Sequence, residues 1–298
     1  MNYRQLGKSK LHVSDIGFGC MSLGKDQEAN QHLIHSAIES GINFFDTADI
    51  YDKGFNEITL GKILKEKRHQ LIIATKVGNV LKPDGSSLDW NPTKEHILSA
   101  IDQSLQRLQT DYIDLYQLHG GTIADPMDET IEAFEILLQK GKIRYYGISS
   151  IRPNVIREYV RRSTMVSVMM QYGLLDRRPA ESCLDLLHQN NIGVLARGSL
   201  ARGLLVNKPA TSFLNYTEEQ VKDAAVAVGS ISRQQRTASQ TAIRFAFAHP
   251  AITSAVVGLR TAEQLEDVIR TMDSPMLNNE ELEILSESIP VIFYEQHR

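Results

Sequence analysis

The feature that most constrains the fold is a regular alternation of short apolar runs with longer stretches of helical periodicity. Eight runs have the length and composition of β-strands: 16–20, 42–45, 71–74, 113–118, 143–148, 166–170, 192–196 and 252–257. Strands that are apolar nearly throughout are typical of a parallel sheet covered on both faces. Because parallel neighbours need a crossover connection, which is usually helical, eight such repeats predict an α/β fold, a (β/α)8 TIM barrel.

Helical periodicity fills the segments between these runs. Apolar stripes at spacings of three and four residues lie at 33–38, 97–108, 131–138 and 265–272. Gly41, Gly141 and Gly193 stand between a predicted helix and the next strand, where glycine commonly ends a helix.

Two segments interrupt the repeat. Residues 1–15 precede the first strand and predict an N-terminal hairpin that closes the bottom of the barrel. Residues 203–236 form an insert after the seventh strand, with a helix pattern at 217–228 that Thr217 would cap. Another helix pattern follows at 237–249, so extra helices are predicted late in the chain. No stretch rich in Pro, Gly or Ser marks a boundary, and we expect one domain over 1–298.

A doubly wound dinucleotide-binding fold is the alternative. Its fingerprint is G-x-G-x-x-G after the first strand, and residues 17–22 lack the third glycine. No helix pattern opens at this point, and the acidic residue expected about 20 positions on is missing. The pattern therefore favours the barrel.

Composition and charge exclude several classes of partner. Lys and Arg number 32 and Asp and Glu 36, a net charge of −4, whereas nucleic-acid binding usually needs a basic surface. The longest stretch without a charged residue, 245–259, contains Pro250 and is shorter than the roughly 20 apolar residues that span a bilayer. The N-terminus has no apolar signal region, and Cys20 and Cys183 cannot form a disulfide framework. We expect a cytoplasmic protein that binds neither nucleic acid nor membrane.

A metal site is not expected either. No C-x-x-C motif is present, and His32 and His35, spaced i and i+3, have no carboxylate to complete a site. Cys20 is interpreted as a small packing residue.

Polar residues at the ends of predicted strands are the strongest functional signal. Asp46, Lys76, His119 and Ser149 each end or directly follow an apolar run. In a barrel the carboxyl ends of the strands form one rim, and that rim carries the active site. Since a lone buried Lys or Asp costs several kcal/mol, we expect Asp46 and Lys76 to pair.

Tyr51 lies in the loop just after Asp46 and suggests proton transfer. A free tyrosine has a pKa near 10, and a nearby ammonium such as that of Lys76 stabilises the phenolate and lowers the pKa. Asp46 would hold Lys76 in place, and a neutral His119 could orient a carbonyl oxygen by a hydrogen bond. These four side chains suit a reaction in which an oxygen receives a proton while another group attacks the carbon bonded to that oxygen.

These residues and their neighbours carry a resemblance to a known family. The matching segments, within roughly residues 3 to 275, are 6–9, 16–21, 45–51, 74–77, 111–119 and 141–149. In this order and at this spacing they resemble the aldo-keto reductases. The resemblance implies a monomeric NADPH-dependent reductase that converts aldehydes or ketones to alcohols. It implies that Tyr51 is the acid, that Lys76 lowers its pKa, that Asp46 anchors Lys76 and that His119 orients the carbonyl.

The resemblance also implies a cofactor site. Ser149 would contact the carboxamide of the nicotinamide. Segment 195–205 is similar to the loop that packs on nicotinamide and wraps the pyrophosphate, with the candidate contacts Arg197, Gly198, Ser199, Leu200 and Gly203. Segment 258–267 is similar to the adenosine-binding segment. Its candidates are Gly258, with Arg260 and Thr261 for the 2′-phosphate, and Gln264 and Asp267 for the adenine.

Several positions depart from the family pattern. Ser150 and Val268 stand where the family often has asparagines, and Arg197 stands where it often has a stacking tyrosine. A guanidinium can also stack on a planar ring. The glutamine usual on the sixth strand falls at Met169, and Gln171, on the same strand face, is the expected substitute.

Two alternatives to an NADPH-dependent reductase stay open at this point. One is a cofactor-binding regulatory module with little turnover, as in potassium-channel β subunits of the same family. The other is an unrelated barrel enzyme whose Lys76 forms a Schiff base. Trp90, in the loop after the third strand, could line a substrate pocket or make a surface contact. The substrate itself is not specified by any motif.

Overall fold

The computed structural model describes residues 1–82, 84–232 and 235–298. Eight parallel strands form a closed barrel in the order β10-β11-β12-β3-β4-β5-β8-β9, and β9 pairs with β10 to complete the ring. The barrel strands are β3 (Ile16–Gly19), β4 (Phe44–Asp46), β5 (Ile72–Val77), β8 (Ile113–Leu118), β9 (Ile143–Ser149), β10 (Ser167–Gln171), β11 (Gly193–Arg197) and β12 (Ile252–Gly258). Each overlaps one of the eight predicted runs, so the predicted barrel is confirmed.

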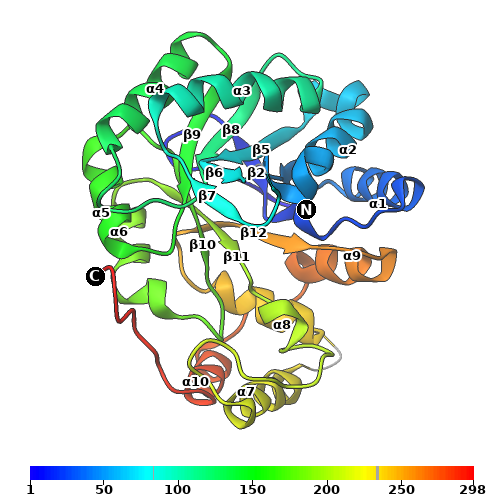
Figure 1. Ribbon diagram of the computed structural model, residues 1–298. Helices are drawn as coiled ribbons and strands as arrows, with labels where there is room; N and C mark the ends of the chain where they lie inside the picture. The colour runs from blue at the N-terminus through cyan, green and yellow to red at the C-terminus, as the bar shows by residue number, and fades with distance from the viewer. Residues whose placement is uncertain (83, 233–234) are drawn as a thin grey trace.

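Helices surround the barrel (Figure 1). They are α1 (Gln27–Glu39), α2 (Phe55–Leu64), α3 (Lys94–Leu108), α4 (Met127–Gln139), α5 (Pro153–Arg162), α6 (Cys183–Gln189), α7 (Glu218–Ile231), α8 (Ala238–Ala246), α9 (Ala262–Ile269) and α10 (Asn279–Glu287). The four predicted apolar stripes fall on α1, α3, α4 and α9, the last running on into the short helical turn after it. No described helix is long and apolar enough to cross a membrane.

The N-terminal hairpin is present as predicted. It consists of β1 (Tyr3–Gln5) and β2 (His12–Ser14), which pair in antiparallel fashion. Leu6 and Val13 are fully buried among the side chains inside the barrel. Between them Gly7 has a φ of +54°, and a Cβ there would lie 2.3 Å from the carbonyl oxygen of Val166. Only glycine permits this close approach.

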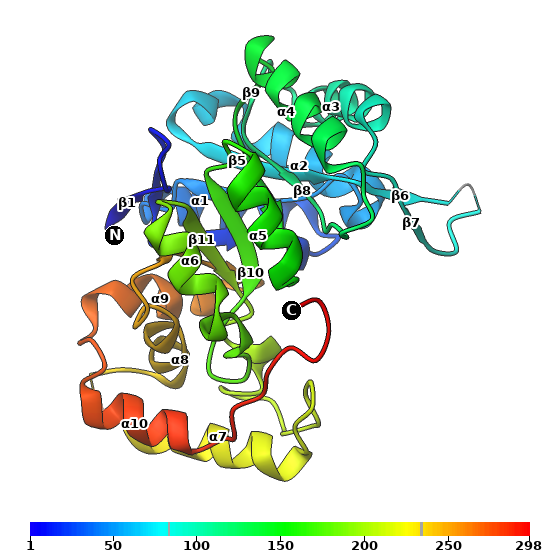
Figure 2. The same cartoon turned by 90° about the vertical axis from the view of Figure 1, so that its left-hand side faces the viewer.

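A second hairpin was not predicted. β6 (Asn79–Leu81) and β7 (Leu88–Trp90) pair within the loop that follows β5. Figure 2 shows this hairpin projecting from the barrel. Its residues are exposed or half-buried. The alternation of buried apolar and exposed polar residues that marks a core strand is therefore missing.

The inner faces of the strands divide the barrel into two layers. Apolar side chains fill the lower layer, among them Phe44, Ala74 and Leu115. Two residues further along the same strand face stand Asp46, Lys76 and Gln117, all buried. Because successive side chains alternate between faces, the polar residues stack above the apolar floor at the carboxyl ends of the strands. This layering positions the candidate site.

The late helices form a second packed layer outside the barrel. Thr217 caps α7, with Gln220 completing a capping box, as the sequence predicted for the cap. α7, α8 and α10 share an apolar cluster that includes Val221, Phe245 and Leu285.

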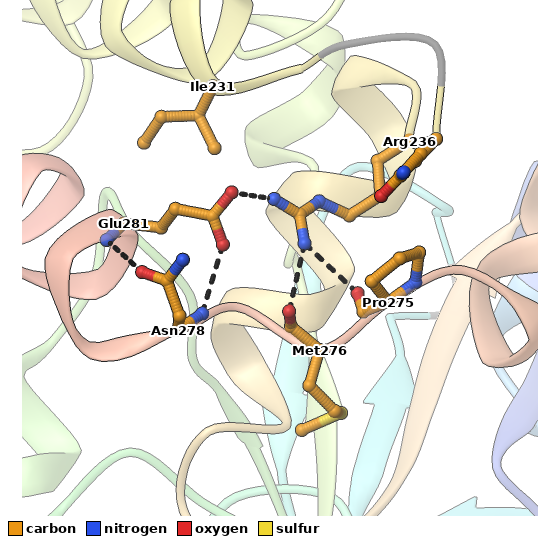
Figure 3. Close-up of a pocket in the computed structure, with 7 residues that line it drawn as sticks. Ile231, Arg236, Pro275, Met276, Asn278 and Glu281 are labelled. Carbon is orange, nitrogen blue, oxygen red and sulfur yellow. Dashed lines mark hydrogen bonds and ion pairs between the residues drawn. The ribbon is translucent and has the colours of Figure 1, made fainter.

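A cavity of about 460 Å³ lies where these late helices meet the segment before α10 (Figure 3). Arg236, which is buried, donates hydrogen bonds to the carbonyl oxygens of Pro275 (3.1 Å) and Met276 (2.9 Å). It also forms an ion pair with Glu281. Both charged groups on the cavity wall are therefore neutralised within the protein, and the arrangement joins the segment before α8 to α10.

Candidate active site

The centre of the rim is a buried ion pair. The Lys76 Nζ lies 2.7 Å from Asp46 Oδ2 and 2.6 Å from the carbonyl oxygen of Thr47. Gln117 donates to the other oxygen of Asp46 at 3.3 Å. Burial acts to lower the pKa of Lys76, but the charges and hydrogen bonds of Asp46 and Tyr51 together outweigh it, and the pKa is raised. Lys76 is therefore an ammonium, and it pairs with Asp46 as the sequence predicted.

Tyr51 lies against this ammonium. Its hydroxyl is 3.4 Å from Lys76 Nζ, close enough for a weak hydrogen bond. The chain then passes through three consecutive left-handed residues, Asp52 (φ +47°), Lys53 (φ +54°) and Gly54 (φ +90°), before α2 begins. Asp and Lys rarely adopt this conformation, so the turn that presents Tyr51 is strained.

The pKa of Tyr51 differs from the sequence expectation. Burial raises it above the ordinary value, and this effect exceeds the lowering by the positive charge of Lys76. The contribution of Lys76 has the expected sign, but the net shift is the opposite because the hydroxyl is desolvated. Tyr51 is consequently a fully protonated phenol at neutral pH.

His119 faces Tyr51 across the rim. The two rings meet edge to face with their centroids 5.9 Å apart. Burial, together with the positive charges of Lys76 and Arg197, lowers the pKa of His119 to about 3. Its Nδ1 is buried and has no hydrogen-bond partner among the described residues. The ring is therefore neutral, as expected, with hydrogen-bonding capacity unused.

The ends of β10 and β11 supply the next part of the rim. Arg197 donates through Nη1 to Gln171 Oε1 at 3.1 Å, and Gln171 in turn donates to Asp176 at 3.0 Å. Gly198 has a φ of +77°, and a Cβ there would lie 3.1 Å from the Gln171 side chain. Met169, two residues before Gln171, belongs to the apolar floor of the barrel, which is why its position carries no polar group.

The loop after β11 is strained and carries an unpaired hydroxyl. Ala201 (φ +47°), Arg202 (φ +59°) and Gly203 (φ +92°) are all left-handed. Ser199 is 3% exposed, yet its Oγ has no partner within the described structure. Leu200 is half-buried and packs between the barrel core and the late helices. A buried hydroxyl without a partner is costly, which is consistent with a polar ligand at this loop.

The segment after β12 places its candidate residues at the start of α9. Gly258 ends the strand, and Thr261 caps the helix by accepting from the backbone N–H of Gln264. The Gln264 side chain accepts from the backbone N–H of Arg260 at 2.9 Å, while the Arg260 side chain is exposed. A helix N-terminus with an adjacent arginine is suited to binding a phosphate.

Asp267 plays a structural part that the sequence did not indicate. Its Oδ1 accepts from Thr237 at 2.7 Å and from Gln240 at 3.1 Å. Thr237 caps α8 and Gln240 lies in its first turn, so Asp267 joins α9 to α8.

Two features near the site escaped the sequence analysis. Gln117 contacts Asp46, and its place two residues before His119 on an inward-facing strand was the available signal. Behind Lys76, the buried Glu57 accepts from Thr75 and Arg107 at 2.6 Å each. Nothing in the spacing of these three residues pointed to that network.

Three further residues of interest lie at the carboxyl ends of strands or in the loops that follow them: Trp90, Ser149 and Cys20. The Trp90 ring lies against Gly78 and Gly120, and its Nε1 donates to Asp125 at 3.0 Å. Gly120 directly follows His119, so the indole stands beside the rim. Ser149 is half-buried at the end of β9. Cys20 is fully buried, and burial raises the pKa of its thiol well above the ordinary value.

Comparison with known proteins identifies the family. The model of the Aldo/keto reductase family matches residues 15–290. An uncharacterised oxidoreductase, YqkF, of Bacillus subtilis is 45% identical over the whole of both chains. The holo form of aldo-keto reductase AKR11C1 from Bacillus halodurans superposes with a TM-score of 0.94, at 46% identity, over 100% of this chain and 99% of that one. The apo form superposes with a TM-score of 0.86, at 44% identity, over the same shares of the two chains.

The chain therefore belongs to the aldo-keto reductase family. It is an NAD(P)H-dependent oxidoreductase built on a TIM barrel, and its general activity is carbonyl reduction.

Proposed function

We propose that this protein reduces aldehydes or ketones to alcohols with NADPH, with Tyr51 as the proton donor. The observation that carries the proposal is the continuous contact from Asp46 through Lys76 to the Tyr51 hydroxyl, with distances of 2.7 and 3.4 Å. A neutral His119 stands next to it on the same rim.

Each residue has a distinct task in this proposal. A bound nicotinamide would supply hydride to the carbonyl carbon. His119 donates a hydrogen bond to the carbonyl oxygen and orients it. Tyr51 gives its phenolic proton to that oxygen as negative charge develops there, and the Lys76 ammonium stabilises the phenolate that remains. Asp46 and the Thr47 carbonyl oxygen keep Lys76 charged and in place.

The cofactor proposal rests on the fit of the residues around the rim. The unpaired Ser199 hydroxyl and the left-handed loop that follows suit a phosphate-bearing ligand. The other proposed contacts lie at the same carboxyl ends of the strands or in the loops after them. They are Ser149, Gln171, Arg197, Gly198, Leu200, Gly203 and Gly258.

Arg260, with Thr261 beside it, is the proposed reader of the 2′-phosphate, and Gln264 and Asp267 remain the proposed contacts to the adenine. We expect Arg260→Ala to raise the Kd of NADPH about tenfold or more, because one charge-assisted contact is lost. The Kd of NADH should change less than about twofold, since NADH has no phosphate at this position. Fluorescence titration with both nucleotides measures the two values. Arg270→Ala, an exposed arginine at the other end of α9, is the matched control, and equal losses for both nucleotides would remove the assigned role.

A cofactor oxidation assay tests the activity. Purified protein with NADPH or NADH should turn over at least part of a panel of aldehydes, diketones and quinones. Tight NADPH binding without turnover on any carbonyl would instead support a regulatory, cofactor-sensing module. Covalent trapping of substrate on Lys76 by borohydride is not expected, because this lysine is held as an ammonium.

We further propose a cytoplasmic monomer acting on a small carbonyl compound. The two cysteines, Cys20 and Cys183, are free and buried, which agrees with a reducing compartment.

A further inference from the structure

Arg197 ends β11 with a charge that is not balanced by its immediate surroundings. Its side chain is exposed, and its side-chain hydrogen bond within the described structure goes to the neutral amide of Gln171. No carboxylate of the described residues lies within ion-pair distance of the guanidinium.

The carboxylates nearest to this part of the rim are already paired. Asp46 is bound by Lys76 at 2.7 Å. Asp176, on the far side of Gln171, receives two hydrogen bonds of 2.8 Å from Arg178. Since the Lys76–Asp46 and Arg178–Asp176 pairs are each neutral, the guanidinium of Arg197 is the unbalanced charge among these five side chains.

Arg197 ends β11 at the carboxyl rim of the barrel, where Tyr51 follows β4 and His119 follows β8, so its charge reaches the reacting end of the site. Arg197 is among the causes that lower the pKa of His119, and it opposes the rise in the pKa of Tyr51. A nicotinamide ring that transfers hydride to a carbonyl held by these two residues must lie in the same small region. It therefore lies within the field of the guanidinium.

The two redox forms of the nicotinamide differ in charge at the ring. The oxidised ring carries one positive charge, and the reduced ring carries none, whereas the pyrophosphate and the 2′-phosphate are the same in both. We infer that Arg197 makes this site discriminate between the redox forms of its cofactor, weakening the binding of NADP⁺ relative to NADPH. The inference rests on the proposed function.

The consequence for turnover concerns direction. A site that disfavours the oxidised ring releases NADP⁺ readily and is less inhibited by it, so carbonyl reduction is favoured over alcohol oxidation. Because Arg197 is exposed, water and salt screen its charge. We expect an effect of about three- to tenfold in relative affinity and a decrease with ionic strength.

The test is the ratio of two dissociation constants, Kd(NADP⁺) to Kd(NADPH). NADPH binding is followed through quenching of Trp90, the single tryptophan, and NADP⁺ binding through displacement of NADPH. Arg197→Gln should lower the ratio about three- to tenfold. Arg197→Lys, which keeps the charge, should retain most of the wild-type ratio. Arg161→Gln, an exposed arginine on α5, is the control for a distant charge and should leave both constants unchanged.

Two results would overturn the inference while the proposed function stands. One is that Arg197→Gln has the same ratio of Kd(NADP⁺) to Kd(NADPH) as the wild type at low salt. The other is that this ratio falls equally in Arg197→Gln and Arg197→Lys. Failure of the wild-type protein to bind either nucleotide would remove the proposed function, and the inference with it.

Discussion

Replacing Tyr51 by phenylalanine should abolish carbonyl reduction while leaving cofactor binding intact. The phenolic hydroxyl of Tyr51 is an acid that contacts the Lys76 ammonium beside the His119 ring, and the variant removes only that oxygen. General acid catalysis contributes about 10²–10⁴-fold to a rate, so kcat should fall by at least about a hundredfold. The Kd of NADPH should stay within about twofold. Steady-state kinetics and fluorescence titration on the same preparation measure both.

Tyr145→Phe provides a matched control. The hydroxyl of Tyr145 accepts a hydrogen bond of 3.0 Å from the backbone N–H of Lys10, at the opposite end of the barrel from the rim. The Tyr145→Phe variant loses the same kind of atom, a phenolic oxygen, at a place remote from the site. Its kcat should stay within about twofold of the wild-type value. Turnover retained in Tyr51→Phe would assign the proton to another group, and a parallel loss in Tyr145→Phe would point to general destabilisation.

The barrel and the main residues of the site were predictable because they depend on strict periodicities. A buried parallel strand must be apolar, and a strand that ends at the rim can afford a polar residue only at its last inward position. Asp46, Lys76 and His119 obey this rule, so their convergence followed from the fold. Gln117, one inward position before His119 on the same strand, departs from this rule, and an uncharged glutamine in a strand does not demand a charged partner.

Other features depend on three-dimensional detail that a linear pattern does not contain. The hairpin of β6 and β7 buries little, so no apolar alternation marks it. The net pKa shift of Tyr51 is a balance between desolvation and the charge of Lys76, and its sign needs the burial of the hydroxyl. Asp267 on α9 accepts a hydrogen bond from Thr237, the residue that caps α8. The sequence does not reveal that these two helices pack together.

Removal of the buried lysine should have the largest effect on stability. Lys76→Met leaves the carboxylate of Asp46, which is 4% exposed, with Gln117 as its remaining partner at the rim. Breaking a buried pair from one side typically costs about 3–5 kcal/mol, and we expect a loss of that size in the free energy of unfolding. Chemical denaturation measures it. Lys62→Met, an exposed lysine on α2, should change stability by less than about 0.5 kcal/mol.

The pH dependence of Lys76→Met identifies the cause of this loss. Burial already raises the pKa of Asp46 from its ordinary 3.8, and removing the ammonium that opposes the shift raises it further. The folded state then binds a proton more tightly than the unfolded state does. The stability deficit should therefore be smallest below about pH 4 and grow as the pH rises through the folded pKa of Asp46. A deficit independent of pH would mean that lost packing, not the unpaired carboxylate, is responsible.

The double variant Asp46→Asn with Lys76→Met separates stability from catalysis. Replacing the carboxylate by a neutral amide removes the uncompensated charge, so most of the loss in unfolding free energy should be recovered. Carbonyl reduction should remain as low as in Lys76→Met, because no ammonium is left to stabilise the Tyr51 phenolate. Recovery of both properties would show that Lys76 supports the fold alone, and that the proton transfer at Tyr51 does not depend on its charge.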